Sequence, residues 1–352
     1  MTRMLNQSCG RCGKRVYFDN WSCLSCGVRL ALMPDLMHMT AIIERYDGTW
    51  VEATDPYGPA YTRCSNSTMH QVCNGIVSLA ETGTLCRACR FTAQIPSLAA
   101  HNSLQYWQRL ERAKRRLLFT LAQLELPLER GPGTREPGLS FAFGADIHPG
   151  HRFVTGHCEG LISINVAEAD DVERERIRAS HGEPYRTLLG HFRHESGHYY
   201  LGLLCRAPDI IASIEDTFGD MLGGYDQALD VFYSHGAPAD WAERHISVYA
   251  ASHPQEDWAE TWAHYLMIVD TLQSAAQAGV TAPPWVGQNK VVERGDFDLM
   301  LDRWLPLAEF ANELARSLGN AEAYPFVLTE AIARKMRLIH STIQSLGEPP
   351  LP

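Results

Sequence analysis

The segment "LLGHFRHESGHYYLGLL", residues 188–204, contains the motif His-Glu-x-x-His at residues 194–198. On a helix, His194 and His198 lie one turn apart on the same face, so both can bind one zinc ion. Glu195 can then take a proton from a water molecule at the metal. The competing interpretation is a buried helix whose polar side chains are satisfied internally. The motif predicts a site that activates water, provided that other elements complete it.

A zinc ion that catalyses hydrolysis needs a third ligand from the protein. The metzincin continuation requires Gly at position 201 and His at position 204, but both are leucine, which excludes that class. The acidic candidates downstream are Glu215, Asp216 and Asp220 in "SIEDTFGD", and Glu256 and Glu260 in "HPQEDWAETWAHYL". The second segment is the better candidate, because it has the signals of a helix with one polar face.

The start of this helix is marked by its capping residues. Ser252 or His253 can cap it, with Pro254 in the first turn, and Ser252 with Gln255 fits a capping box. The helix then has a polar face with Glu256, Glu260 and His264, and an apolar face with Trp258, Trp262, Tyr265 and Val269. A carboxylate of the polar face can therefore reach the two histidines.

Eight of the ten cysteines precede residue 90 and fall into two groups of four. Cys9, Cys12, Cys23 and Cys26 form two Cys-x-x-Cys knuckles, the spacing of a zinc ribbon, and predict a first structural zinc. Cys64, Cys73, Cys86 and Cys89 predict a second structural zinc, with His70 able to replace Cys64 or Cys73. Modules of this size lack an adequate core, and zinc binding can supply the missing stability.

The remaining segments position these groups. We expect a helix from Ser103 to Leu128 with Leu104 on its inward face and the basic run "RLERAKRR" facing solvent. A linker follows over residues 129–138, then strands of a small sheet, and helices from Pro184 onward. Gly197 interrupts the His-Glu-x-x-His helix at a cost of up to about 1 kcal/mol relative to Ala. We expect it to allow close packing of that helix on the sheet.

Composition restricts the function. The chain has 352 residues, 45% of them hydrophobic, which is typical of a folded protein with a real core. No apolar run approaches a membrane span, and the N-terminus "MTRMLNQSCGRCG" has no apolar signal region, so we expect a cytoplasmic protein. The net charge of −10 arises after residue 100, which argues against nucleic acid as a partner.

Tyr249, Glu256 and Glu260 in "YAASHPQEDWAE" resemble the active-site pattern of the zinc peptidases that include anthrax lethal factor and Pro-Pro endopeptidase. The resemblance implies that Glu256 is the third zinc ligand. It also implies that Glu260 orients a histidine ligand and that Tyr249 stabilises the oxyanion. It covers only the surroundings of the site.

The whole chain resembles the bacterial zinc-binding metallopeptidases with an N-terminal zinc ribbon. The resemblance rests on both cysteine groups, "TGHCEGLISINVAEADD", "EPYRTLLGHFRHESGHYY" and "HPQEDWAETWAHYL". It implies an α+β fold: a double zinc-ribbon region over residues 1–100, a linking helix and linker over 101–136, and a zincin-like, mostly helical domain with a small sheet over 137–352.

We therefore expect a gluzincin-type hydrolase that carries one catalytic zinc and two structural zincs and acts on a peptide or protein. Its ribbons could in addition bind a protein partner. Two other classes stay open. A SprT-like protease at DNA would require a third histidine ligand and a basic surface. A non-catalytic zinc-ribbon binding or scaffold protein would need no glutamate that activates water.

Overall fold

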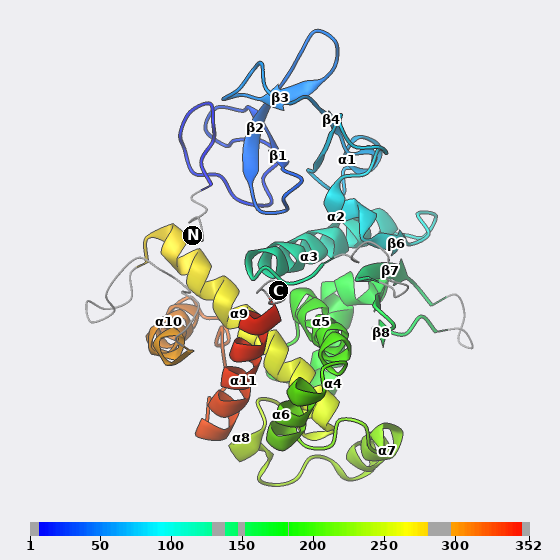
Figure 1. Cartoon of the computed structure of the whole chain (residues 1–352), viewed down its shortest axis with the longest axis vertical. Helices are drawn as coiled ribbons and strands as arrows, with labels where there is room; N and C mark the ends of the chain where they lie inside the picture. Colours follow the sequence, from blue (N-terminus) through cyan, green and yellow to red (C-terminus); the bar gives the residue numbers. More distant parts are fainter. Residues whose placement is uncertain (1–6, 129–137, 147–151, 182, 281–296, 347–352) are drawn as a thin grey trace. The chain divides into compact units, whose positions relative to one another are not determined.

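The computed structural model describes residues 7–128, 138–146, 152–181, 183–280 and 297–346 (Figure 1). The chain divides into two compact units. The first comprises Met1–Gly156 and Gly160–Glu173, and the second comprises His157–Glu159 and Arg174–Pro352. The short strand β8 (Gly156–Cys158) is where the chain first passes from one unit to the other.

The first unit begins with an antiparallel sheet of five short strands in the order β1-β2-β3-β4-β5. These strands are β1 (Arg29–Leu32), β2 (Met39–Glu44), β3 (Trp50–Glu52), β4 (Tyr61–Arg63) and β5 (Ile76–Ser78). Neighbours in sequence are neighbours in the sheet, as short hairpin connections allow. At the β2–β3 turn, Gly48 has a φ of 81°, a conformation that residues with a side chain rarely adopt. The sheet's buried face packs around the first cysteine group, with Leu30 and Ala41 against Cys9 and Cys23.

A second sheet in this unit is parallel where β6, β7 and β9 pair in that order. Its strands are β6 (Thr92–Gln94), β7 (Ser140–Gly144) and β9 (Leu161–Asn165), and the unit's helices are α1 (Ser65–Met69), α2 (Arg87–Arg90), α3 (Ser103–Gln123) and the 3₁₀ helix η1 (Val166–Ala169). Phe141, Phe143, Ile162 and Ile164 of the two longer strands are fully buried. Parallel strands are usually covered on their faces, and these strands form much of the unit's apolar core.

Helix α3 corrects part of the expectation that its basic run faces solvent, since Arg109 and Arg112 are exposed but other charged residues of the run are not. Glu111, Lys114 and Arg115 of "RLERAKRR" are buried. Lys114 Nζ lies 2.8 Å from Glu111 Oε2, and Arg115 Nη1 donates to the carbonyl of Val72 at 2.8 Å. Each charge is thus paired or hydrogen-bonded, which is the condition for burying it. A pattern of charges alone could not reveal these partners.

The bounds and the inward face of α3 also differ from the expectation. The helix ends at Gln123 rather than Leu128, and Leu104 is 40% exposed. Trp107, Leu110 and Leu117 are fully buried, so the inward face starts one turn later than expected.

The second unit consists mostly of helices. They are α4 (Asp171–His181), which begins in the first unit, α5 (Leu188–Leu204), α6 (Pro208–Phe218), α7 (Tyr225–His235), α8 (Trp241–Arg244), the 3₁₀ helix η2 (Tyr249–Ala251), α9 (Pro254–Ala278), α10 (Phe297–Ser317) and α11 (Glu330–Leu346). Helices α5 and α9 pack against each other at the centre of this unit (Figure 1). The chain is therefore α+β, as expected.

Gly197 explains the close approach of α5 and α9. A Cβ at Gly197 would lie 2.9 Å from Ala259 Cα and 3.2 Å from Trp262 Cβ. The indole N–H groups of Trp258 and Trp262 then donate to Gly197 O at 3.0 Å and to Ser196 Oγ at 3.1 Å. The expectation of close packing at Gly197 was right, but its partner is helix α9 rather than the sheet.

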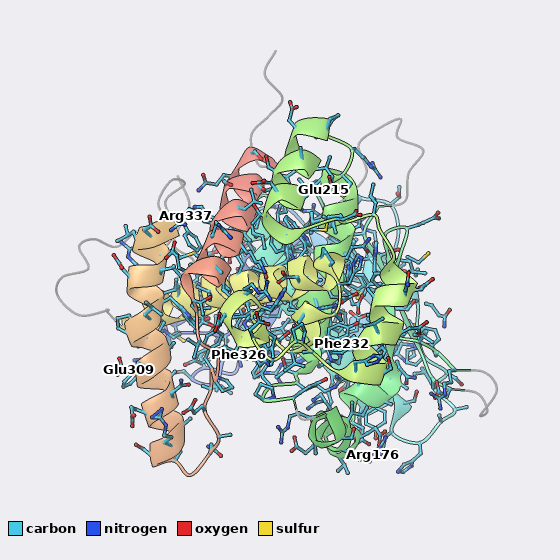
Figure 2. The ribbon with its side chains drawn as sticks, turned by 90° about the horizontal axis from the view of Figure 1, so that it is seen from below. Arg176, Glu215, Phe232, Glu309, Phe326 and Arg337 are labelled. Atoms are coloured by element: carbon cyan, nitrogen blue, oxygen red, sulfur yellow. The ribbon has the colours of Figure 1, made fainter. Side chains whose placement is uncertain are left out.

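Helix α11 fixes the start of α9. Lys335 Nζ lies 2.5 Å from the buried Asp257 Oδ2 and donates to the carbonyl of Arg244 at 2.6 Å. Further along α11, Arg337, labelled in Figure 2, pairs with Asp298 of α10 at 2.6 Å. The Lys335–Asp257 link holds the helix that carries two of the candidate site's carboxylates, and the Arg337–Asp298 pair joins α11 to α10.

None of the helices that the structure describes is long and apolar enough to cross a membrane. The expected linker over residues 129–136 lies outside the described residues. The three expected regions, 1–100, 101–136 and 137–352, stay predictions.

Candidate metal centres

Within the described residues, three groups of side chains could each hold a metal ion. In each group, one ligand atom per residue lies within 4.8 Å of all the others. The groups are Cys9, Cys12, Cys23 and Cys26; Cys64, Cys73, Cys86 and Cys89; and His194, His198 and Glu256. These are the ligand sets that the sequence predicts.

The first cysteine group is built by two matching turns. Cys9 N donates to Lys14 O, and Cys23 N donates to Val28 O, both at 2.8 Å. The sulfur atoms of Cys9 and Cys26 lie 3.7 Å apart, and those of Cys12 and Cys23 lie 3.6 Å apart. A tetrahedron with Zn–S bonds of about 2.3 Å has edges of about 3.8 Å. The spacing therefore fits a zinc ion held by four thiolates.

The second cysteine group is fully enclosed. Cys64, Cys73 and Cys89 have no exposed surface, and Cys86 is 4% exposed. Cys64 and Cys86 lie at the N-caps of α1 and α2, and Cys86 N donates to Cys64 Sγ at 3.3 Å. A Cβ at Gly75 would lie 2.4 Å from Cys86 Sγ, so only glycine fits beside this sulfur. All four cysteines take part, so the group does not need the alternative ligand His70.

The third group joins α5 and α9. His194 Nε2 and His198 Nε2 lie 3.2 Å apart, and Glu256 Oε2 lies 3.0 and 3.5 Å from them. Zn–N bonds of about 2.0–2.1 Å place tetrahedral ligand atoms about 3.3 Å apart. Glu256 is 1% exposed, and Oε2 accepts no hydrogen bond among the described residues. A buried carboxylate oxygen and two imidazole nitrogens at these separations are a donor set that fits a zinc ion.

Glu260 lies one turn beyond Glu256 and contacts the other nitrogen of a candidate ligand. Its Oε1 lies 2.7 Å from His194 Nδ1, and Ser247 Oγ donates to its Oε2 at 2.6 Å. Burial, the largest single influence, would raise the pKa of Glu260, but the hydrogen bond and the charge of His194, with smaller contributions from His264 and Ser247, together outweigh it and lower the pKa to about 2. The carboxylate can thus fix the ring so that Nε2 faces Glu256.

Two further predicted residues lie at this group. Glu195 is next to His194 on α5 and is 9% exposed. The Tyr249 ring of η2 has its centroid 6.0 Å from that of His194 and 6.1 Å from that of Phe232, which is labelled in Figure 2. Burial, together with the charge of Glu256, raises the pKa of Tyr249 well above its usual value. Its hydroxyl therefore keeps its proton at neutral pH.

Sequence reasoning missed two residues of the site. Tyr225, the first residue of α7, donates a hydrogen bond to Glu256 Oε1 at 2.6 Å. Ser247 is the partner of Glu260 described above. Neither stands in a spacing that links it to the motif, and no signal in a single sequence identifies them. The alternatives Glu215, Asp216 and Asp220 do not belong to the His194 group.

Helix α9 is capped by one of the two residues that the sequence offered. His253 is the N-cap, and its Nδ1 accepts from Gln255 N at 3.1 Å while Nε2 lies 2.9 Å from Gly223 O. These contacts fix one neutral tautomer, with the proton on Nε2. Ser252, the other candidate, does not cap the helix. The cap holds the first turn of α9 and thereby Glu256.

Comparison with known proteins is consistent with this geometry. Residues 6–100 match a family model described as a zinc-ribbon domain. Uncharacterized proteins of Mycobacterium bovis and of two strains of Mycobacterium tuberculosis are each 38% identical over 340 residues, 96% of this chain and 95% of the relative. No solved structure matches the chain significantly. Residues 103–342 match the family model described as "Putative zinc-binding metallo-peptidase", and the chain belongs to that family.

Proposed function

We propose that the chain is a zinc-dependent peptidase of the gluzincin type, with zinc bound by His194, His198 and Glu256. The observation that carries the proposal is the convergence of these three ligand atoms beside Glu195. A zinc ion there would supply Lewis-acid chemistry, polarising a substrate carbonyl and lowering the pKa of a water molecule towards roughly 7. The third ligand is a glutamate rather than a histidine, which favours this class over a SprT-like protease.

Glu195 is the proposed general base. It accepts a proton from the attacking water and later gives it to the nitrogen of the leaving amine. Its backbone places it beside His194, and its side chain is buried enough to exclude much of the bulk water. The Glu195 carboxylate has no hydrogen bond or ion pair among the described residues, so it is available for this proton transfer.

Tyr249 is the proposed donor to the oxyanion. Its raised pKa keeps the phenol protonated, and its ring lies near that of His194. A hydrogen bond from this hydroxyl would stabilise the charge that develops on the carbonyl oxygen in the transition state. Glu260, held by Ser247, orients His194 and does not itself touch substrate.

We further propose that the other two zinc ions are structural. Each cysteine group offers four thiolates, which fill a tetrahedron and leave no position for substrate. The ten cysteines, all within the described residues, form no disulfide, so the thiols of both groups are free to bind metal. The proposed substrate is a peptide or protein, because the family that the chain matches is described as a zinc-binding metallo-peptidase.

The test is Glu195→Gln, compared with Glu309→Gln on α10, an exposed glutamate labelled in Figure 2. Both variants and the parent are incubated with a peptide library, and cleavage is measured by mass spectrometry. Glu195→Gln should keep its zinc content while turnover falls by roughly 10²- to 10⁴-fold. Glu309→Gln should cleave like the parent. Equal cleavage by Glu195→Gln and the parent would defeat the proposal.

A further inference from the structure

The two oxygens of Glu256 have different environments. Oε2 faces His194 Nε2 and His198 Nε2 at 3.0 and 3.5 Å, whereas Oε1 accepts the hydrogen bond from Tyr225 at 2.6 Å. A carboxylate can bind a metal with one oxygen or with both. The tyrosine hydroxyl occupies the second oxygen and leaves only one for a metal.

We infer that Tyr225 is a positioning residue that holds Glu256 as a one-oxygen ligand. With Tyr225 in place, the protein supplies three ligand atoms, and a fourth tetrahedral position stays open for water or substrate. Without it, Oε1 could turn towards the metal and take up the position that the chemistry needs. The inference rests on the proposed metal site but not on peptidase activity.

The position of Tyr225 is set by the start of α9 and not by its own helix. Helix α7, all of whose residues the structure describes, has no buried side chain. The Tyr225 ring instead packs edge-on against His253, with centroids 5.0 Å apart. His253 caps α9 and contacts Gly223 O, two residues before Tyr225. The same cap therefore positions both the tyrosine and the carboxylate that it contacts.

The turn before Tyr225 makes this approach possible. Gly224 has a φ of 61°, in the left-handed region that favours glycine. A Cβ at Gly223 would meet Asp220 Oδ2 at 2.3 Å. The Gly-Gly pair allows a tight entry into α7 that brings its first side chain onto Glu256.

Tyr225 and Tyr249 have separate roles in this arrangement. The Tyr225 proton is already donated to Glu256, and burial, followed by that hydrogen bond, raises the pKa of Tyr225. The Tyr249 hydroxyl has no hydrogen bond among the described residues and can donate to a substrate oxygen. Loss of Tyr225 should therefore change metal binding, whereas loss of Tyr249 should change turnover.

The experiment compares Tyr225→Phe with Tyr233→Phe in the full-length chain. Tyr233 lies on the same helix and is 70% exposed, which makes it a matched control. The affinity for the chelator-labile zinc is measured by competition with a chelator. Cobalt then replaces zinc in that site alone, while the two cysteine groups keep their zinc. Tyr225→Phe should bind zinc about 10- to 100-fold more weakly, the usual effect of losing an outer partner of a ligand.

The cobalt spectrum supplies the signature that a purely structural role would not change. Tyr225→Phe should absorb more weakly in the visible d–d region, because coordination by both oxygens raises the ligand number above four. Tyr233→Phe should match the parent in affinity and spectrum. A lower melting temperature or lower turnover for Tyr225→Phe, with parental affinity and spectrum, would overturn the inference. A parent chain without chelator-labile zinc would overturn the proposed function together with it.

Discussion

The cysteine groups of the first unit and the histidine–glutamate group of the second unit use metal ligands in different ways. Each cysteine group has four thiols within 4.8 Å of one another, held by short turns in the first group and by helix caps in the second. The histidine–glutamate group has three ligands from two long helices, with Glu195 and Tyr249 beside them. Under the proposed function, this difference in ligand number and neighbouring residues distinguishes two zinc sites that stabilise the fold from one that reacts.

The outer partners of the ligands differ as well. In the second cysteine group, the hydrogen bond to Cys64 Sγ comes from the backbone N–H of Cys86. In the other unit, side chains contact the candidate ligands, Glu260 at His194 and Tyr225 at Glu256. Backbone donors come with the local fold, whereas side-chain partners can be replaced one at a time. The metal affinity of the histidine–glutamate group can therefore be changed one side chain at a time without unfolding the second unit.

The largest expected effect is the loss of folded protein when a thiol of the second cysteine group is removed. Cys89→Ser removes a fully buried thiolate, and structural zinc contributes roughly 10–16 kcal/mol of apparent folding free energy. This is comparable to the roughly 5–15 kcal/mol of net stability of a typical protein. Cys89→Ser should therefore lose most soluble, folded protein, as measured by soluble yield and circular dichroism.

His198→Ala is the matched variant in the other unit. It removes one of the three candidate zinc ligands. Helix α5, which carries His198, also packs against α9 through contacts that involve no metal. The protein should therefore stay folded and lose its chelator-labile zinc. Metal analysis should find three zinc ions in the parent and two in His198→Ala. If His198→Ala failed to fold while Cys89→Ser folded normally, the two regions would have the opposite roles.

The second effect concerns chemistry within the histidine–glutamate site. Tyr249→Phe keeps the ring that packs near His194 but removes the hydroxyl donor. Because the oxyanion forms only in the transition state, turnover should fall by about 10²- to 10³-fold, with little change in substrate affinity. Steady-state kinetics on a cleaved peptide measure both. A rise in KM with unchanged kcat would assign Tyr249 to substrate binding instead.

The three candidate ligand groups that lie together in the structure could be predicted from local motifs, except that the resemblance to zinc peptidases was needed to select Glu256 as the third ligand. Two Cys-x-x-Cys knuckles and a His-Glu-x-x-His turn are determined by neighbouring residues, and the Glu256 helix has its own capping signals. Tyr225 and Ser247 reach the site only through the packing of α7 and η2 near α9. That packing leaves no periodic pattern in a single sequence, so these residues could not be predicted.

The fold shows the same limit. Trp258 and Trp262 were expected on an apolar face, and both are fully buried, but their hydrogen bonds to α5 were not predictable. The burial of Glu111 and Lys114 in α3 was missed because one ion pair neutralises both charges. Hydrophobic periodicity identifies the apolar side of a helix, but not a polar pair that another element covers.

The smallest expected effect lies furthest from the metal, at Ser247. Its hydroxyl donates to Glu260 Oε2 at 2.6 Å and accepts from Ala250 N at 3.1 Å. Ser247→Ala should lower the affinity for the chelator-labile zinc by about 2- to 10-fold, matching the roughly 0.5–1.5 kcal/mol of a single hydrogen bond. The effect is small because Glu260 still contacts His194 directly. Chelator competition measures it.

Ser252→Ala is the control, because it removes a hydroxyl from the same segment without removing a known hydrogen bond. Ser252 is 7% exposed, and its Oγ has no hydrogen-bond partner among the described residues. Its loss should leave zinc affinity unchanged and be neutral or slightly stabilising, since no buried partner is left unsatisfied. If both variants weakened zinc equally, the segment would act through its backbone, and the chain from Ser247 through Glu260 to His194 would not position the metal. If only Ser247→Ala weakened zinc binding, a side chain two contacts away from a ligand would be shown to change the zinc affinity of the histidine–glutamate group. The cysteine groups, which are built by backbone turns, offer no such route.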